Sequence, residues 1–174
     1  TILVPPTPLR SLLTDMFPRI PRLTASMSCT KAYAGMERSS HACKVLPPPS
    51  SGYAGVFIRE SLAPGARKAA LLTQLNNQII RQQRTINNFP QMQAVIATSP
   101  AQWLKLVRTG AQIFGFYSID GFAWAPAFSL PLGMTGCVEM GVTAYSADGS
   151  AATDSFDNVS ISEGPQPVTT VAFA

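Results

Sequence analysis

Between positions 103 and 124 the chain reads WLKLVRTGAQIFGFYSIDGFAW. In 103–108 the residues alternate: both leucines fall on one side of an extended chain, and Trp103 and Lys105 fall on the other. A second run, 112–119, ends at Asp120-Gly121, and an Asp-Gly pair between apolar runs favours a tight hairpin turn. We therefore expect two adjacent antiparallel strands here, with the chain resuming an extended path at 122–124.

The same alternation continues outward from this stretch. In residues 53–59, Val56 and Ile58 fall on one side and Phe57 and Arg59 on the other. Turn residues separate the further strands that we predict, at 68–74, 78–84, 92–97, 138–145 and 152–161, with the last two as a hairpin and one more strand at 167–174. A helix over 69–88 is the alternative, but Thr73, Asn76 and Asn77 interrupt it and no apolar stripe of helical period persists.

The first 50 residues differ, because eight of the 15 prolines lie there. Proline breaks helices and removes a donor from a sheet, so we expect residues 1–51 to be an extended, irregular arm. A short helix over 9–16 has no good cap. Residues 52–174 then form one antiparallel, two-sheet β-sandwich, a jelly roll in an all-β class.

Composition narrows the classes of function. Hydrophobic residues make up 46% of the chain and charged residues 13%, so the surface is largely uncharged. Residues 1–108 carry all 13 Lys and Arg and a charge of +10, and the remainder carries −6. The basic residues are scattered singly, which argues against nucleic-acid binding. No apolar run reaches 18 residues, so we expect no membrane span.

From Gly52 to Ile161 the order of motifs resembles the concanavalin-A-like, laminin-G-like jelly-roll domains of secreted bacterial proteins. The resemblance rests on five segments, AGVFIRESLAPGARKAALL (54–72), WLKLVRTG (103–110), FYSIDGFAW (116–124), MGVTAYS (140–146) and SFDNVSI (155–161). It implies a lectin-like sandwich without catalytic residues, with a role in glycan binding or surface architecture. It does not extend to residues 1–51, where such domains usually begin with Gly-rich strands.

The sequence offers few combinations of residues that could form a catalytic site. The single histidine, His41, has no acid nearby except Glu37, which does not favour a nucleophilic triad. A glycosidase needs two carboxyl groups flanking one bond. Most acids here fall in turns or stand alone in a strand, so we expect no enzyme activity.

Binding residues are easier to name. Aromatic platforms beside polar groups suit sugars, and Tyr117, Asp120, Trp124 and Tyr145 are our candidates for glycan contact. A calcium ion at a loop rim is a weak possibility through Asp148, Asp154 and Asp157; no other cofactor is expected. Cys29 and Cys43 are candidates for a disulfide in an oxidising compartment, whereas Cys137 lies in an apolar stretch.

Two functions remain in competition. Both ends, TILVPP and PVTTVAFA, are apolar and β-prone, which favours pairing with copies of the same chain. The first expectation is therefore a non-catalytic, secreted protein that self-assembles into a filament or cell-surface layer. The alternative is a carbohydrate-binding module of a secreted polysaccharide-active system.

Overall fold

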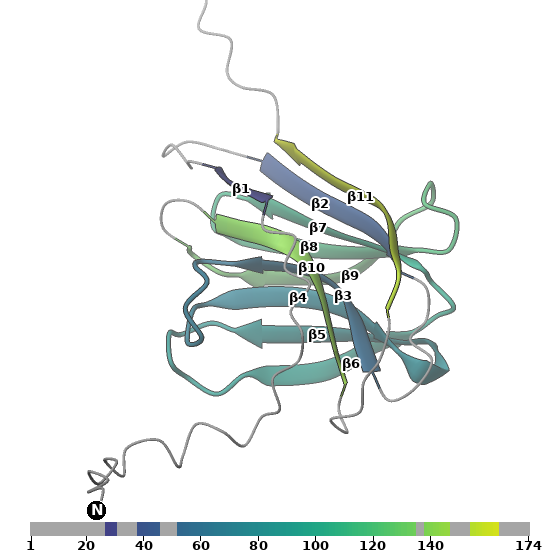
Figure 1. Ribbon diagram of the computed structural model, residues 1–174, viewed down its shortest axis with the longest axis horizontal. Helices are drawn as coiled ribbons and strands as arrows, with labels where there is room; N and C mark the ends of the chain where they lie inside the picture. Colours follow the sequence, from purple (N-terminus) through teal and green to yellow (C-terminus); the bar gives the residue numbers. More distant parts are fainter. Residues whose placement is uncertain (1–26, 31–37, 46–51, 135–137, 147–153, 164–174) are drawn as a thin grey trace, which may run out of the picture.

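The computed structural model describes residues 27–30, 38–45, 52–134, 138–146 and 154–163, which form two packed antiparallel sheets (Figure 1). The six-stranded sheet has the order β1 (Met27–Thr30), β10 (Val138–Ser146), β3 (Gly52–Arg59), β4 (Lys68–Gln74), β5 (Gln78–Arg84) and β6 (Met92–Thr98). The five-stranded sheet has the order β11 (Phe156–Glu163), β2 (Arg38–Val45), β7 (Trp103–Thr109), β8 (Gln112–Ser118) and β9 (Ala125–Pro131). The predicted all-β, two-sheet sandwich is confirmed.

The core lies between the sheets and follows the predicted alternation. Val56 and Ile58 of β3 and Leu104 and Leu106 of β7 are fully buried in one cluster. Phe57 lies on the opposite side of β3, in a second, smaller cluster with Ala70, Leu72 and Ile80. The six-stranded sheet therefore has apolar side chains on both faces, and its outer cluster must be covered by something other than the other sheet.

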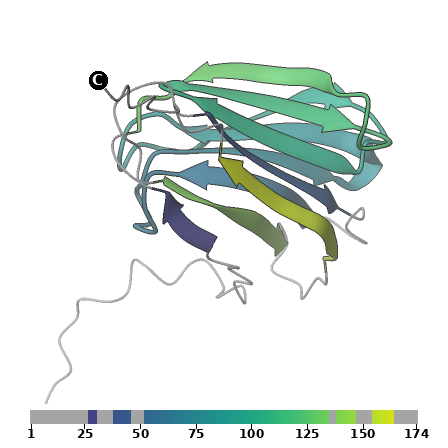
Figure 2. The same cartoon turned by 90° about the horizontal axis from the view of Figure 1, so that it is seen from above.

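Two strands come from the segment expected to be an irregular arm, and this expectation is corrected. β1 pairs with β10, and β2 lies between β11 and β7 inside the five-stranded sheet. The segment 38–45 contains no proline and alternates, with His41, Cys43 and Val45 buried inward. The edge strands β1 and β11 lie along the same side of the sandwich (Figure 2).

The predicted hairpin across Asp120-Gly121 is confirmed as an antiparallel pair of β8 and β9. Its turn is wrong in detail, because β8 ends at Ser118 and β9 begins at Ala125, which makes the connection a six-residue loop. The second predicted hairpin is wrong, because β10 and β11 lie in different sheets and do not pair with each other. The local sequence pattern located β10 and β11, but the strands with which they pair are determined by the packing of segments far away in the sequence.

The helical alternative for 69–88 is also wrong, because β4 and β5 pair there from Lys68↔Arg84 to Gln74↔Gln78. They are joined by a 3-10 turn, Leu75–Asn77, in which Asn76 and Asn77 have φ values of 68° and 60°. Asparagine tolerates this left-handed region better than most residues, which explains its use here. The helix considered at 9–16 and the strand predicted at 167–174 lie outside the described residues. Within the described part of the chain, no helix has the length and apolar character to span a bilayer.

Candidate functional site

The structure separates the four predicted glycan contacts. Tyr117 packs against the core cluster between the sheets. Trp124 lies just before β9, where the Lys105 ammonium is 3.9 Å from the centroid of its ring. Asp120 belongs to the β8–β9 loop, and Tyr145 lies on the outer face of the six-stranded sheet. The four residues therefore do not form one site.

Asp120 is occupied by its own loop. Its Oδ1 accepts hydrogen bonds from the backbone N–H of Phe122 at 2.8 Å and of Ala123 at 2.9 Å, and from the Ser118 hydroxyl at 2.9 Å. These bonds, the one from Phe122 first, hold the pKa of Asp120 below its usual value. The carboxylate orders a loop whose tip, Phe122, is 89% exposed.

Two of the three calcium candidates, Asp154 and Asp157, lie among the described residues. Asp148 lies outside the described residues. The Asp157 carboxylate accepts a hydrogen bond from the N–H of Asn158, and burial raises the pKa of Asp154. Within the described ranges, no three His, Cys, Asp or Glu side chains gather as a metal site would require.

Cys43 is a free thiol buried between the sheets, so the predicted disulfide with Cys29 is not formed. Cys29 lies in β1, in the six-stranded sheet, whereas Cys43 lies in β2 of the five-stranded sheet. Burial raises the pKa of Cys43 to about 12. The residue therefore acts as a small core side chain.

Tyr145 leads to a site that the sequence indicated only in part. Its ring stacks on that of Tyr53, with centroids 4.8 Å apart and planes 18° from parallel. The two residues are directly opposite in the β10–β3 register and pack over the outer apolar cluster. They provide the cover that this cluster requires.

Polar side chains from three further strands form a hydrogen-bonded network that includes the Tyr145 hydroxyl. The side-chain amide of Gln82 on β5 donates to the Tyr145 oxygen at 2.8 Å and to Gln93 Oε1 on β6 at 3.2 Å. The Lys68 ammonium on β4 donates to Gln82 Oε1 at 2.9 Å. We call Tyr53, Tyr145, Gln82, Gln93 and Lys68 the tyrosine–glutamine face.

Strand pairing explains this convergence. Gln82 and Gln93 are directly opposite across β5 and β6, and Lys68 lies diagonal to Gln82 on the same outer side of β4. The sequence identified Tyr145 but missed the other four members of the face. In the sequence, these four residues could be recognised only as outward-facing positions of their strands. Which of them are neighbours becomes clear only when the strand register is known.

The chemistry of this face suits a polyhydroxylated ligand. The exposed Gln93 amide both donates and accepts and the lysine adds donors, whereas the buried Gln82 holds these groups in position through its own bonds. Burial raises the pKa of Tyr145 to about 12, so its hydroxyl stays neutral at physiological pH and can donate or accept. The tyrosine rings add a flat apolar surface beside these groups.

Comparisons with known proteins agree on the fold. A functionally unknown protein from Saccharomyces cerevisiae matches with a TM-score of 0.57 and 12% identity, over 79% of this chain and 74% of that one. The GH43 BlXynB protein from Bacillus licheniformis matches with a TM-score of 0.53 and 17% identity, over 74% of this chain. An engineered GH43 glycoside hydrolase matches with a TM-score of 0.51 and 18% identity, over 75% of this chain and 30% of that one.

The match spans 27% of the Bacillus licheniformis chain, so the sandwich corresponds to about a quarter of that protein. No protein-family model and no curated protein sequence matches this chain. At these identities the likeness concerns the fold alone. Two packed antiparallel sheets in this arrangement are the concanavalin-A-like sandwich, as the sequence motifs indicated.

Proposed function

We propose that this protein is a carbohydrate-binding β-sandwich module, and that the tyrosine–glutamine face holds the glycan. The observation that carries the proposal is the hydrogen-bonded network in which Gln82 links Lys68, Gln93 and the Tyr145 hydroxyl, beside the Tyr53 ring. Such a face offers hydroxyl groups several donors and acceptors, and it offers the apolar side of a sugar ring a flat aromatic surface.

The fold gives second support. The same sandwich occurs as about a quarter of a GH43 chain, and GH43 proteins include a glycoside hydrolase. We propose that the module binds carbohydrate without performing chemistry on it. In the described residues the Glu60 carboxylate pairs with Arg67 and the Asp120 carboxylate is held by its loop, so both already have structural roles.

Self-assembly, the first expectation from the sequence, stays a prediction. Its evidence lay in the two chain ends, residues 1–6 and 167–174, which are outside the described residues. Sedimentation velocity of the purified chain tests it directly: concentration-dependent growth would support assembly, and a single monomeric boundary would contradict it. Secretion likewise stays a prediction from the sequence.

Binding to immobilised soluble polysaccharides, followed by affinity electrophoresis, tests the proposed function. We expect the unmodified chain to be retarded by at least one polysaccharide, and Tyr145→Phe or Gln93→Ala to reduce that retardation. Gln112→Ala is the matched control, because Gln112 is an exposed glutamine in β8 of the other sheet. Loss of retardation in Trp124→Ala with no effect of Tyr145→Phe would place the site on the opposite face and contradict this assignment.

A further inference from the structure

β6 forms one edge of the six-stranded sheet (Figure 1). Its neighbour is β5, and no other strand that the structure describes pairs with its far side. In an antiparallel sheet the backbone N–H and C=O groups of alternate residues point to the same side of a strand. Those on the far side of β6 therefore have no ladder partner among these strands, and such a row is a template onto which another strand can pair.

The other three edges of the sandwich carry features that oppose pairing. β9 contains Pro126 and Pro131, and proline cannot donate to a neighbouring strand. β11 carries Asp157 and Glu163 and has an irregular register, and β1 has only four residues. Natural sheets protect their edges with prolines, charges, bulges and short strands. β6 has seven residues, MQAVIAT, without a charge or a proline, and is the least protected of the four edges.

Most of β6 is also regular. β5 and β6 pair without interruption from Gln83↔Met92 to Ile80↔Val95, and the register shifts only beyond that point, toward the end of β6. A bulge bends a strand and turns an edge away from further pairing. Because this irregularity follows Val95, the first four residues of β6 keep the geometry that a second strand requires.

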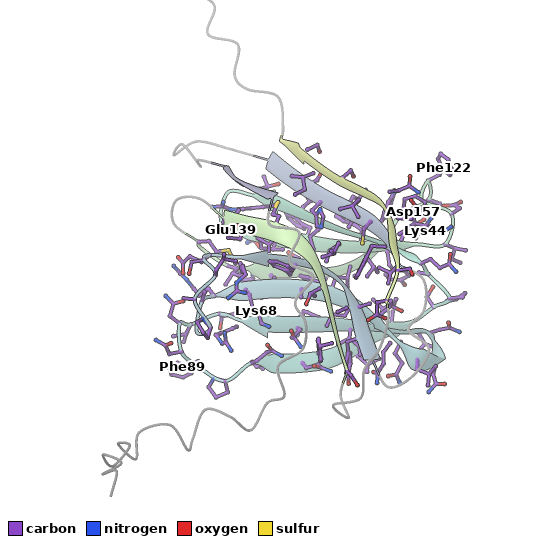
Figure 3. All side chains as sticks on the ribbon, viewed as in Figure 1. Lys44, Lys68, Phe89, Phe122, Glu139 and Asp157 are labelled. Carbon is purple, nitrogen blue, oxygen red and sulfur yellow. The ribbon has the colours of Figure 1, made fainter. Side chains whose placement is uncertain are left out.

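Exposed apolar side chains gather along the same edge. Nine large hydrophobic residues of the described ranges are exposed, and four of them lie between positions 86 and 95. These four are Ile86, Phe89, Met92 and Val95, each between 53% and 62% exposed. Phe89 lies in the connection from β5, at the corner of the sheet where β6 begins (Figure 3). Apolar residues that cluster at a surface in this way mark a contact with another molecule, whereas single ones need no explanation.

The composition of β6 indicates which molecule that is. A strand that pairs with its own copy in an antiparallel sense meets the same surface, related by a two-fold axis. Any charge near the centre of the strand would then face a like charge, which destabilises a sheet. β6 carries no charge. It offers no ion pair that would select a different partner, and nothing on it repels a second copy.

We propose that two copies of this chain pair through β6, antiparallel about a two-fold axis perpendicular to the sheet. The two six-stranded sheets then become one continuous sheet, and the contact closes on itself because each copy uses its single β6 edge. An axis of this direction keeps both outer faces on the same side. The two tyrosine–glutamine faces therefore lie side by side, with Gln93 of each copy in the pairing strand. The pairing itself does not depend on the proposed function.

Sedimentation equilibrium of the whole chain over a series of concentrations tests the pairing. The interface consists of one strand edge and a few apolar side chains, so we expect a monomer–dimer equilibrium with a Kd of about 10 μM. Val95→Lys places a charge on this edge and brings two like charges together in the pair, so it should raise the Kd at least about tenfold.

Val159→Lys is the matched control. Val159 is also an exposed valine in an edge strand, β11, and the change in net charge is the same. Its Kd should stay within about twofold of that of the parent chain, because β11 takes no part in the contact. Both variants should unfold at temperatures near that of the parent chain, since both valines are exposed.

Hydrogen exchange of the parent chain gives a second readout that needs no substitution. Amides on the far side of β6 should exchange about fourfold more slowly at ten times the Kd than at a tenth of it, because pairing protects them. Amides of β3, in the interior of the sheet, should exchange at the same rate at both concentrations.

Three results would overturn the pairing. The first is a monomer at every concentration, and the second is a dimer that Val95→Lys leaves intact. The third is protection of the β6 amides that does not change with concentration, which would mean that the chain covers its own edge. None of them bears on the proposed carbohydrate binding, because the tyrosine–glutamine face lies within one chain and is tested by its retardation in polysaccharide.

Discussion

The side-chain amide of Gln82 donates to the hydroxyl of Tyr145 at 2.8 Å, although two other strands of the sheet lie between β5 and β10. Gln82 is 4% exposed, so the bond satisfies a polar group that water reaches poorly. It also connects the end of β10 to β5, the strand beside the β6 edge. The relationship therefore contributes both to stability and to the shape of the proposed binding face.

Tyr145→Phe should destabilise the protein by about 1 kcal/mol, because it removes one partner of a buried amide and changes little else. Urea unfolding measures the effect as a lower midpoint with an unchanged slope. Tyr53→Phe is the control, since it removes the other hydroxyl of the stacked pair and leaves the bonds among Gln82, Gln93 and Tyr145 in place. If the two variants lose the same free energy of unfolding, the Gln82–Tyr145 bond contributes no more to stability than the Tyr53 hydroxyl does.

Most strands could be predicted from local pattern. β4 and β5 begin and end where predicted, because the Asn76-Asn77 turn separates two short runs that are bounded by turn residues. β9 was not predicted, since prolines at 126 and 131 obscure its alternation. β2 was missed for a different reason: its neighbours in sequence are rich in proline, although the strand itself has none.

The candidate site was less accessible to sequence reasoning, because it depends on which strands become neighbours. Gln82 and Gln93 are eleven residues apart and meet through the β5–β6 register, whereas Tyr145 reaches them from a strand that pairs elsewhere. Tyr117 and Trp124 flank one loop in sequence, yet one packs inward and the other lies beneath Lys105. Aromatic character alone could not distinguish these environments.

His41 should make the fold sensitive to mild acid. Its side chain is fully buried, Nδ1 lies 2.9 Å from the carbonyl oxygen of Ser160, and burial lowers its pKa below the ordinary 6.5. The unfolded state then binds the proton more readily than the folded state. Stability should be constant above about pH 7 and should fall by up to about 1.4 kcal/mol per pH unit as pH drops below 6.5.

Urea midpoints measured from pH 8 to pH 5 test this expectation. His41 is the single histidine of the chain, so no other imidazole contributes in that range. In His41→Gln, which keeps a polar side chain but cannot be protonated, the decline between pH 7 and pH 5.5 should disappear. A decline of the same size in this variant would assign the acid sensitivity to carboxyl groups.

Cys43 should be chemically inert in the folded protein. With its pKa raised to about 12 and its side chain buried, almost none of it is thiolate at pH 8, and the thiolate is the reactive form. After treatment with iodoacetamide at pH 8, peptide mass spectrometry should find Cys43 unmodified in the native chain. In about 6 M guanidinium, which unfolds even very stable domains, the residue should be fully modified. Rapid native modification would mean that β2 separates easily from the core.

Asp120 should matter to the β8–β9 loop and not to glycan binding. Asp120→Ala removes the acceptor shared by the N–H groups of Phe122 and Ala123, so both amides should exchange with solvent roughly tenfold faster. Asp120→Asn keeps a side-chain oxygen and should show a smaller increase. Because these bonds lower the pKa of Asp120, the protected state should persist from neutral pH down to below the ordinary 3.8, and be lost only as the carboxylate becomes protonated.

Asp157→Ala provides the comparison, because the Asp157 carboxylate accepts a bond from its neighbour Asn158 within β11, which does not pair with β8 or β9. This change should leave the loop amides unchanged. The loop lies on the five-stranded sheet, whereas the proposed glycan site lies on the outer face of the six-stranded sheet. Polysaccharide binding by Asp120→Ala should therefore equal that of the parent chain. A loss of binding in parallel with the faster exchange would instead make the exposed Phe122 tip part of the binding surface.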